Sequence, residues 1–517
     1  MSVHTKLSGI FGNGTVLQRE ASNIITGTDP SARRVTVEIE NKTYSAEVRD
    51  GKFSVEIPPH AASFGLTVTI TGTDRVVLEN VCFGDVFMLS GQSNMELPLS
   101  RVRDVSSEEI DAADNPYIRQ YRLTPQYVFR VGCEAELPEV PWTKALPGEI
   151  EEMSAVGFFF AQRTYKKINV PIGLILNAQG GSSIEAWMPM NLLDRFDDYN
   201  GLIEPFLNNG SLDKFLANRE SRIAQWYESV QSEDSIRFST EKPGDAESIL
   251  LPAIFPASRD EKFSGSMWFY REFVLEKEPT NKALLYLGEL IDSDDTYING
   301  VLVGQTGYRY PPRKYAFDAS VLRKGKNLIA VRLVVQYGKG GFVPEHPYYL
   351  DSGNERIELS GQWSYAIERK ALNDGVEGFL AQKLPSGLFR ASILPLRGFS
   401  MRGVLWYQGE SNSGEAERYD EKFAAMVEAW RTSLGDVLPI ICVELADYTD
   451  PVKGAEKGWS EIQRMQLAAP DMTIGCGVVS AKDLGAPFEL HPQFKSELGK
   501  RLSDKALEMI YDVTVNS

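Results

Sequence analysis

Residues 89–98 read LSGQSNMELP and place a small, polar turn directly behind the apolar run Val86–Leu89. The apolar run is typical of a buried strand, and Ser93 lies in the turn that follows it. A strand that runs into such a turn is how several hydrolase folds present a serine hydroxyl to a cleft, although many ordinary loops begin in the same way. The stretch therefore makes Ser93 a candidate nucleophile, and the choice between the two interpretations depends on the rest of the chain.

Helices and strands alternate on both sides of a long interruption in the sequence. We expect strands at 170–181, 403–412, 438–445 and 472–479, and helices at 154–167 with Ser154 as the cap, at 419–434, at 459–469 and from Pro492 onward. Strands that alternate with helices favour a parallel sheet covered on both faces. The fold class predicted for this part is α/β.

Two other regions show the sequence pattern of β domains. Short alternating runs such as RRVTVEIENKTYSAEV, separated by turn signals, predict an antiparallel β-sandwich at the N-terminus. A second set of such runs, with the turn pair Asn299–Gly300, predicts a β-sandwich inserted into the α/β domain. The expected domains are an N-terminal β-sandwich (1–85), the first part of the α/β domain (86–200), a partly helical linker (201–261), the inserted β domain (262–370) and the second part of the α/β domain (371–517).

Composition limits the classes of partner. The 517 residues can form about three domains of roughly 150 residues each. A formal charge of −17 without any Lys/Arg block disfavours nucleic acid or an anionic membrane, so we expect a small substrate instead. Four widely spaced cysteines indicate neither a zinc cage nor a disulfide framework. The N-terminus shows no signal-peptide pattern, so we expect a soluble cytoplasmic protein. A homo-oligomer is a possible further partner.

The scarcity of histidine narrows the choice of general base. The chain has only four, and a serine nucleophile needs one of them. His4 is near the terminus, His60 lies in a loop of the first sandwich, and His346 belongs to the inserted domain. His491 remains as the candidate, because it stands in a loop of the α/β domain just before the last predicted helix.

Polar groups follow the other predicted strands of the α/β domain. Gly180 and Gly181 end one strand, where a backbone N–H can approach a substrate oxygen closely. Gln408, Glu410 and Asn412 end another. Since open α/β sheets bind ligands at the carboxyl ends of their strands, we expect these groups to lie in the same cleft as Ser93.

Taken together, GDVFMLSGQSNMELP, PIGLILNAQGGSSIEAWMP, GVLWYQGESN and ELHP resemble the sialate O-acetylesterase family, which consists of SGNH/GDSL-type serine hydrolases. The resemblance covers nearly the whole chain. It implies a flavodoxin-like SGNH hydrolase domain with a parallel sheet, a leading β-sandwich and a jelly-roll-like insertion. It also implies removal of acetyl groups from sugar hydroxyls through an acyl-serine intermediate, with no metal or organic cofactor.

The resemblance also implies roles for individual residues. It makes Ser93 the nucleophile, His491 the base and the Ser93 N–H one oxyanion donor. The remaining expected positions are Gly180 or Gly181 and Gln408 or Asn412 as further oxyanion donors, and Gln92, Asn94, Trp187, Trp406 and Arg402 as substrate contacts. One position departs from the family, which usually has Asp two residues before the histidine where this chain has Glu489. Either Glu489 or Glu410 can therefore be the residue that orients His491.

The nature of the sugar stays open at this level. Sialic acids carry a carboxylate that favours a basic contact, for which Arg101, Arg103 and Arg402 are candidates. Acetylated xylan or other plant oligosaccharides favour aromatic platforms, for which Trp187 and Trp406 are candidates. A lipase or thioesterase, and a noncatalytic carbohydrate-binding protein, are the competing function classes.

Overall fold

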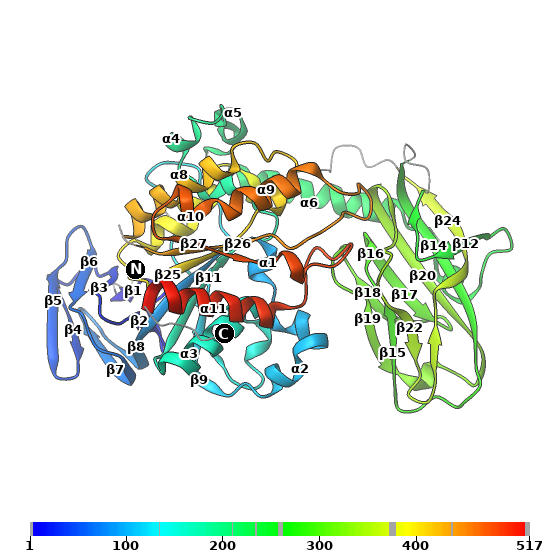
Figure 1. Cartoon of the computed structure of the whole chain (residues 1–517), viewed down its shortest axis with the longest axis horizontal. Helices are drawn as coiled ribbons and strands as arrows, with labels where there is room; N and C mark the ends of the chain where they lie inside the picture. Colours follow the sequence, from blue (N-terminus) through cyan, green and yellow to red (C-terminus); the bar gives the residue numbers. More distant parts are fainter. Residues whose placement is uncertain are drawn as a thin grey trace.

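The computed structural model describes residues 4–133, 135–208, 210–232, 235–256, 262–371, 379–435 and 438–511. Its architecture is mixed α/β, with a central α/β region between two β-rich regions (Figure 1). In the figure the N-terminal strands lie at the left in blue, and the inserted β strands lie at the right in green. The expected α/β class is confirmed at this level.

The central sheet positions the candidate site. Its strand order is β10-β9-β11-β8-β25-β26-β27, in which all neighbours from β9 to β27 are parallel and β10 is antiparallel. The inner strands β11, β25 and β26 and the second half of β8 are buried almost throughout, as expected for a sheet covered on both faces. The strands are β8 (Arg75–Gly91), β9 (Asn115–Arg122), β10 (Thr143–Ala145), β11 (Ile172–Ala178), β25 (Gly403–Tyr407), β26 (Ile440–Glu444) and β27 (Cys476–Ser480).

Helices cover both faces of this sheet (Figure 1). On one face α3 (Ala155–Ile168) packs against α11 (Lys495–Tyr511), because Gly499 lets the backbone of α11 approach Phe159 and Phe160. Helices α8 (Tyr419–Leu434), α9 (Lys457–Leu467) and α10 (Ala469–Met472) contact one another on the other face. Ser154 caps α3 as predicted, since its hydroxyl accepts a hydrogen bond from the Gly157 N–H at 3.1 Å. The last helix begins at Lys495 rather than at the predicted Pro492.

Strand β8 joins the N-terminal β region to the α/β region. Its first part pairs with β2 and β7, and from Asp85 onward it pairs with β11. The partner changes between Gly84 and Asp85, at the predicted boundary of 85. The other strands of this region are β1 (Lys6–Leu7), β2 (Val16–Gln18), β3 (Asn23–Thr28), β4 (Arg34–Ile39), β5 (Lys42–Glu47), β6 (Lys52–Ile57) and β7 (Ser63–Thr71).

The inserted region has a six-stranded sheet, β12-β24-β14-β20-β17-β18, and a four-stranded sheet, β19-β15-β22-β23, with a shared apolar core. A small sheet, β13-β21-β16, adjoins them. Because β12 and β13 belong to these sheets, the region starts before the predicted residue 262. Its strands are β12 (Glu247–Leu251), β13 (Ile254–Phe255), β14 (Phe263–Leu275), β15 (Lys282–Leu287), β16 (Leu290–Ile291), β17 (Ser293–Ile298), β18 (Val301–Thr306), β19 (Lys314–Asp318), β20 (Gly325–Gly338), β21 (Gly340–Phe342), β22 (Tyr348–Asp351), β23 (Arg356–Glu358) and β24 (Gly361–Lys370).

Part of the predicted linker is a long helix, α6 (Ser211–Ser229), whose Trp226 packs against Val334 of the inserted region. The remaining helices are α1 (Ser93–Glu96), α2 (Arg103–Asp111), α4 (Met190–Leu193), α5 (Asn200–Ile203) and α7 (Ser235–Thr240). Across the described residues, no helix combines the length and apolar character needed to span a bilayer. All four cysteines are free in this structure.

Candidate active site

Ser93 and His491 meet at the carboxyl ends of the parallel strands. Ser93 begins α1 directly after β8, and His491 lies in the connection between β27 and α11. The two residues are 398 positions apart in the chain, yet Nε2 of His491 is 2.9 Å from Oγ of Ser93. This is the distance at which a general base can take the proton of a nucleophilic hydroxyl.

The surroundings of His491 keep its imidazole neutral. The residue is 8% exposed. Its burial, followed by the positive charges of Lys495 and Arg101, lowers the pKa of the imidazole to about 3. A neutral ring that accepts at Nε2 carries its hydrogen on Nδ1. Nδ1 is buried and has no hydrogen-bond partner among the described residues, so the ring lacks the orienting acceptor of a complete triad.

Neither candidate carboxylate contacts the imidazole. One oxygen of the Glu489 carboxylate lies within 4.8 Å of ligand atoms of Glu289 and His346. Burial raises the pKa of Glu489, and the backbone N–H of His491 is one of the groups that partly offset this rise. Oε1 of Glu410 accepts a hydrogen bond from Asn94 at 2.7 Å, while its Oε2 is buried without a partner among the described residues. The expectation that one of these two residues orients His491 is therefore not met in this structure.

Asn94 has a supporting position rather than the expected substrate contact. It is 2% exposed, and its amide donates to Glu410 and to the Leu490 carbonyl at 3.0 Å. Its Oδ1 accepts from Nζ of the fully buried Lys495 at 2.6 Å. Burial lowers the pKa of Lys495 to about 7 and raises the pKa of Glu410 to about 6. Asn94 thus connects the loop after β25, helix α11 and the peptide that precedes His491.

Gln92 is also buried and engaged. It is 3% exposed, and its Oε1 accepts hydrogen bonds from the backbone N–H groups of Gly409 and Ser411 at 3.4 and 3.2 Å. This side chain fixes the loop after β25 to the loop after β8. The predicted substrate contact at Gln92 is therefore corrected to a structural contact between loops.

The two candidate oxyanion glycines differ. A Cβ on Gly180 would lie 3.5 Å from Cβ of Ser93, so the loop is adjacent to the serine. The Gly180 N–H, however, donates to Oε2 of Glu96 at 2.9 Å. Among the described residues the N–H groups of Ser93 and Gly181 have no such partner. Gly181 also has a φ of +74°, which favours glycine, and of the two predicted alternatives it remains the candidate donor.

The amides of Gln408 and Asn412 are occupied by the fold. Nε2 of Gln408 donates to the Ser182 carbonyl at 3.0 Å and to Oδ1 of Asn412 at 2.8 Å. Nδ2 of Asn412 donates to both oxygens of Glu185, which is paired with Lys422 at 2.7 Å. Because both amide nitrogens already donate to buried groups of the fold, the structure does not support either residue as an oxyanion donor. The buried Glu185–Lys422 pair is not recognisable from the sequence motifs.

The predicted sugar contacts at Trp187, Trp406 and Arg402 are also corrected. Trp187 and Trp406 are 1% and 0% exposed and pack against Trp430 in the core. Arg402 precedes β25, at the opposite end of the sheet from Ser93, with its guanidinium over the ring of Tyr511. None of the three side chains is placed to contact a substrate at Ser93.

The inserted region contributes directly to the site. The ring of Tyr310 stands edge-on to the imidazole of His491, with centroids 5.2 Å apart at an angle of 86°. Arg101 donates to the Tyr310 carbonyl at 3.3 Å, and Arg309 pairs with Asp450 at 3.3 Å. Sequence reasoning missed Tyr310, because the contact joins positions 310 and 491 in separate regions and no local pattern reports it.

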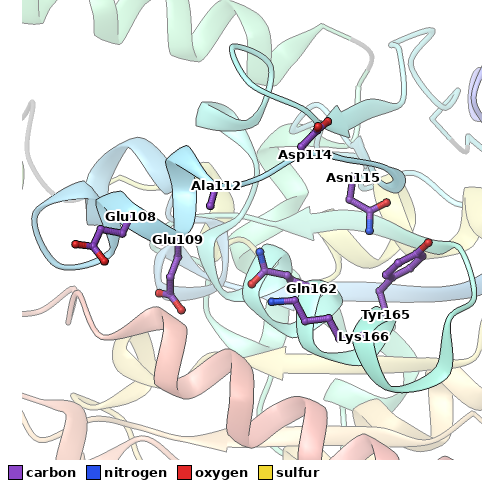
Figure 2. A pocket seen from close by; sticks show the side chains of 8 residues that line it. All are labelled: Glu108, Glu109, Ala112, Asp114, Asn115, Gln162, Tyr165 and Lys166. Carbon is purple, nitrogen blue, oxygen red and sulfur yellow. The ribbon is translucent and has the colours of Figure 1, made fainter.

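A separate hollow of about 460 Å³ lies elsewhere on the α/β region (Figure 2). Figure 2 shows that its lining comes from α2, α3 and the segment leading into β9, including Glu109, Gln162 and Lys166. None of the predicted site residues lines it.

Comparison with known proteins gives a family match for the two parts of the chain that form the site. The family described as "Carbohydrate esterase, sialic acid-specific acetylesterase" matches residues 83–208 and 388–508. These segments contain Ser93 and His491 and flank the inserted β region.

Curated relatives show the same similarity. The human sialate O-acetylesterase is 24% identical over 294 residues, which is 50% of this chain and 54% of that protein. The mouse sialate O-acetylesterase is 28% identical over 207 residues, which is 35% of this chain and 37% of that protein. The chain thus spans about half the length, or less, of the curated relatives it matches.

A solved structure supports the fold over nearly the full chain. A carbohydrate acetylesterase from Xanthomonas citri superposes with a TM-score of 0.59 and 20% sequence identity. The match covers 99% of this chain and 77% of that one, so the β-rich regions share in the similarity of fold.

Proposed function

We propose that this chain, whose residues 83–208 and 388–508 match the sialic acid-specific acetylesterase family of carbohydrate esterases, is a carbohydrate O-acetylesterase. The observation that carries the proposal is the 2.9 Å contact between Ser93 Oγ and His491 Nε2 at the ends of the parallel strands. A binding protein has no need for a serine hydroxyl held against a buried neutral imidazole. The substrate is an acetyl ester of a sugar hydroxyl.

The proposed reaction is acyl transfer to serine. His491 takes the Ser93 proton at Nε2 while Oγ attacks the acetyl carbonyl and forms a tetrahedral intermediate. The N–H groups of Ser93 and Gly181 are the proposed donors to the oxyanion. Collapse of the intermediate breaks the ester bond, and the imidazolium returns its proton to the departing sugar hydroxyl. Water then attacks the acyl-serine with His491 again as base, which releases acetate and restores Ser93.

The finer fold assignment is part of this proposal. Without its edge strands β9 and β10, the central sheet has the order β11-β8-β25-β26-β27, which is 2-1-3-4-5 in chain order. This order is typical of flavodoxin-like folds, which bind ligands where the strand order reverses, between β8 and β25. Ser93 follows one of these two strands, in support of an SGNH-type hydrolase domain. The paired antiparallel sheets of the inserted region support the jelly-roll-like assignment.

An O-acetylated sialic acid is the proposed substrate. Arg101 lies close enough to His491 for its charge to lower the pKa of the imidazole, and its guanidinium can attract the carboxylate of an acidic sugar. The tryptophans that favoured a neutral oligosaccharide are buried in the core. Acetylated xylo-oligosaccharide is the second candidate, and its distinguishing property is the lack of a carboxylate.

A panel of esters tests the function. We expect the purified chain to hydrolyse p-nitrophenyl acetate, to lose activity steeply as the acyl chain lengthens, and to release acetate faster from O-acetylated sialic acid than from acetylated xylo-oligosaccharide. The measurement is kcat/KM for each substrate. A preference for long acyl chains would indicate a lipase, and no turnover of any ester would indicate a binding protein.

The carboxylate variants test the incomplete triad. Because neither carboxylate contacts the imidazole, we expect Glu489→Gln and Glu410→Gln each to lower kcat by less than about tenfold. A residue that sets the histidine tautomer would cost roughly 10⁴ when changed in this way. The measurement is kcat for both variants, with circular dichroism as the control for folding. A fall of roughly 10⁴ in one of them would identify that residue as the orienting member of a triad.

A further inference from the structure

Three side chains of metal-binding type meet where the inserted region touches the loop before α11. Glu289 lies between β15 and β16, His346 lies between β21 and β22, and Glu489 precedes His491 by two residues. Each offers one nitrogen or oxygen atom, and these atoms all lie within 4.8 Å of one another. We refer to Glu289, His346 and Glu489 as the interdomain cluster.

The cluster contains buried polar groups without partners. Glu289 is 3% exposed, and no ion pair joins its carboxyl group to another described residue. Nε2 of His346 is also buried without a partner in the described part of the chain. Buried carboxylates and imidazoles are normally hydrogen-bonded, paired with an opposite charge or bound to a metal. Two acidic groups and one ring nitrogen, whose ligand atoms lie within 4.8 Å of one another, are suited to the last of these.

The neighbouring cations do not neutralise the cluster, because they have other partners. Arg309 pairs with Asp450 at 3.3 Å and Arg313 pairs with Asp294 at 2.8 Å. Lys314 pairs with Asp104, and Arg101 donates to the Tyr310 carbonyl. The two carboxyl groups of the cluster therefore have no ion-pair partner among the described residues.

We propose that the interdomain cluster binds a divalent transition-metal ion, with Zn²⁺ as the best fit. One imidazole and two carboxylates are ligands that Zn²⁺ accepts, and a fourth tetrahedral position stays open for water. Ligand atoms around Zn²⁺ at about 2.1 Å lie about 3.4 Å apart, so atoms that now lie within 4.8 Å of one another need to approach by at most about 1.4 Å. Gly288 supports the geometry, because a Cβ there would lie 2.6 Å from Cβ of His346.

The bound ion connects two regions of the chain. Glu289 and His346 come from the inserted region, while Glu489 comes from the loop that carries His491. Binding ties this loop to the inserted region and holds the side chain of Glu489 away from the imidazole. The ion has a structural part in the site and takes no step in ester hydrolysis. The inference stands independently of the proposed esterase activity, because its test measures binding.

Zinc titration of the tag-free, metal-stripped full chain tests the inference. By isothermal titration calorimetry we expect one equivalent of Zn²⁺ per chain, with little heat from Mg²⁺ or Ca²⁺, which prefer ligand sets made of oxygen alone. His346→Ala and Glu289→Gln should each weaken Zn²⁺ binding at least tenfold. His60→Ala is the matched control, because His60 also contacts a glutamate, Glu40, at 2.9 Å but has no third ligand. This control should bind Zn²⁺ as the unmodified chain does.

Co²⁺ absorption gives a second readout of the same site. A visible band from tetrahedral Co²⁺ should appear in the unmodified chain, disappear on addition of Zn²⁺ and be absent in His346→Ala. Circular dichroism establishes that each variant is folded. The proposal is overturned if the unmodified chain binds no Zn²⁺, or if folded His346→Ala and Glu289→Gln both bind it as tightly as the unmodified chain. Esterase activity without zinc binding would overturn this inference and leave the proposed function intact.

Discussion

Ser93→Ala is expected to lower kcat for acetyl ester hydrolysis by roughly 10⁴-fold or more. The hydroxyl is the proposed nucleophile, and without it only the oxyanion donors and substrate binding contribute, which leaves roughly 10³–10⁴ over the reaction in water. The fold should persist, because the change removes one hydrogen bond, to His491, worth about 1 kcal/mol. The measurement is kcat for p-nitrophenyl acetate beside a thermal melt.

Ser90→Ala is the matched control for this variant. Ser90 lies in β8, three residues before Ser93, and its buried hydroxyl has no hydrogen-bond partner among the described residues. Its removal changes the same number of atoms without touching His491. A Ser93→Ala variant that turns over as fast as the Ser90→Ala control would contradict the assignment of the nucleophile.

His491→Ala is expected to have an effect of the same size. Without the imidazole the serine keeps its proton, and removal of either member of a nucleophile–base pair costs about as much as removal of both. The double variant Ser93→Ala/His491→Ala should therefore be no slower than either single variant. The measurement is kcat for the three variants, with His60→Ala as a control at a surface histidine. Full activity of folded His491→Ala would show that another group serves as the base.

The sequence predicted the Ser93–His491 pair because its constraints are simple. The chain has only four histidines, so few serine–histidine pairs are possible for a serine that follows a buried strand. A parallel sheet also places the carboxyl ends of its strands at one edge. The cap at Ser154 and the bounds of α8 followed from local rules of helix formation in the same way. These features depend on short segments or on the order of whole elements.

The wrong predictions concern the direction in which side chains point. Trp406 lies in a strand that is buried on both faces, and a pattern of apolar residues cannot say whether the end of such a strand meets a core or a cleft. Gln408 was expected to face a substrate. In the structure its amide instead donates a hydrogen bond to the Ser182 carbonyl, which belongs to another loop. Such hydrogen bonds depend on tertiary structure, and the spacing of residues in the sequence does not predict them.

Glu489 shows how one methylene group changes a site. The family position usually holds Asp, and the sequence already placed the role of this residue in doubt. In the structure the longer side chain reaches Glu289 and His346 of the inserted region instead of the imidazole. That position of the side chain depends on contacts between separate regions, so the sequence alone does not predict it.

Covalent labelling tests the central claim most directly. The full chain is treated with a fluorophosphonate, which reacts with an activated serine hydroxyl, and the site of modification is mapped by peptide mass spectrometry. The account predicts one adduct per chain, on the peptide that contains Ser93, and no comparable adduct in His491→Ala, because the hydroxyl then has no base. An adduct on another serine, or equal labelling of Ser93 in the folded His491→Ala variant, would contradict it.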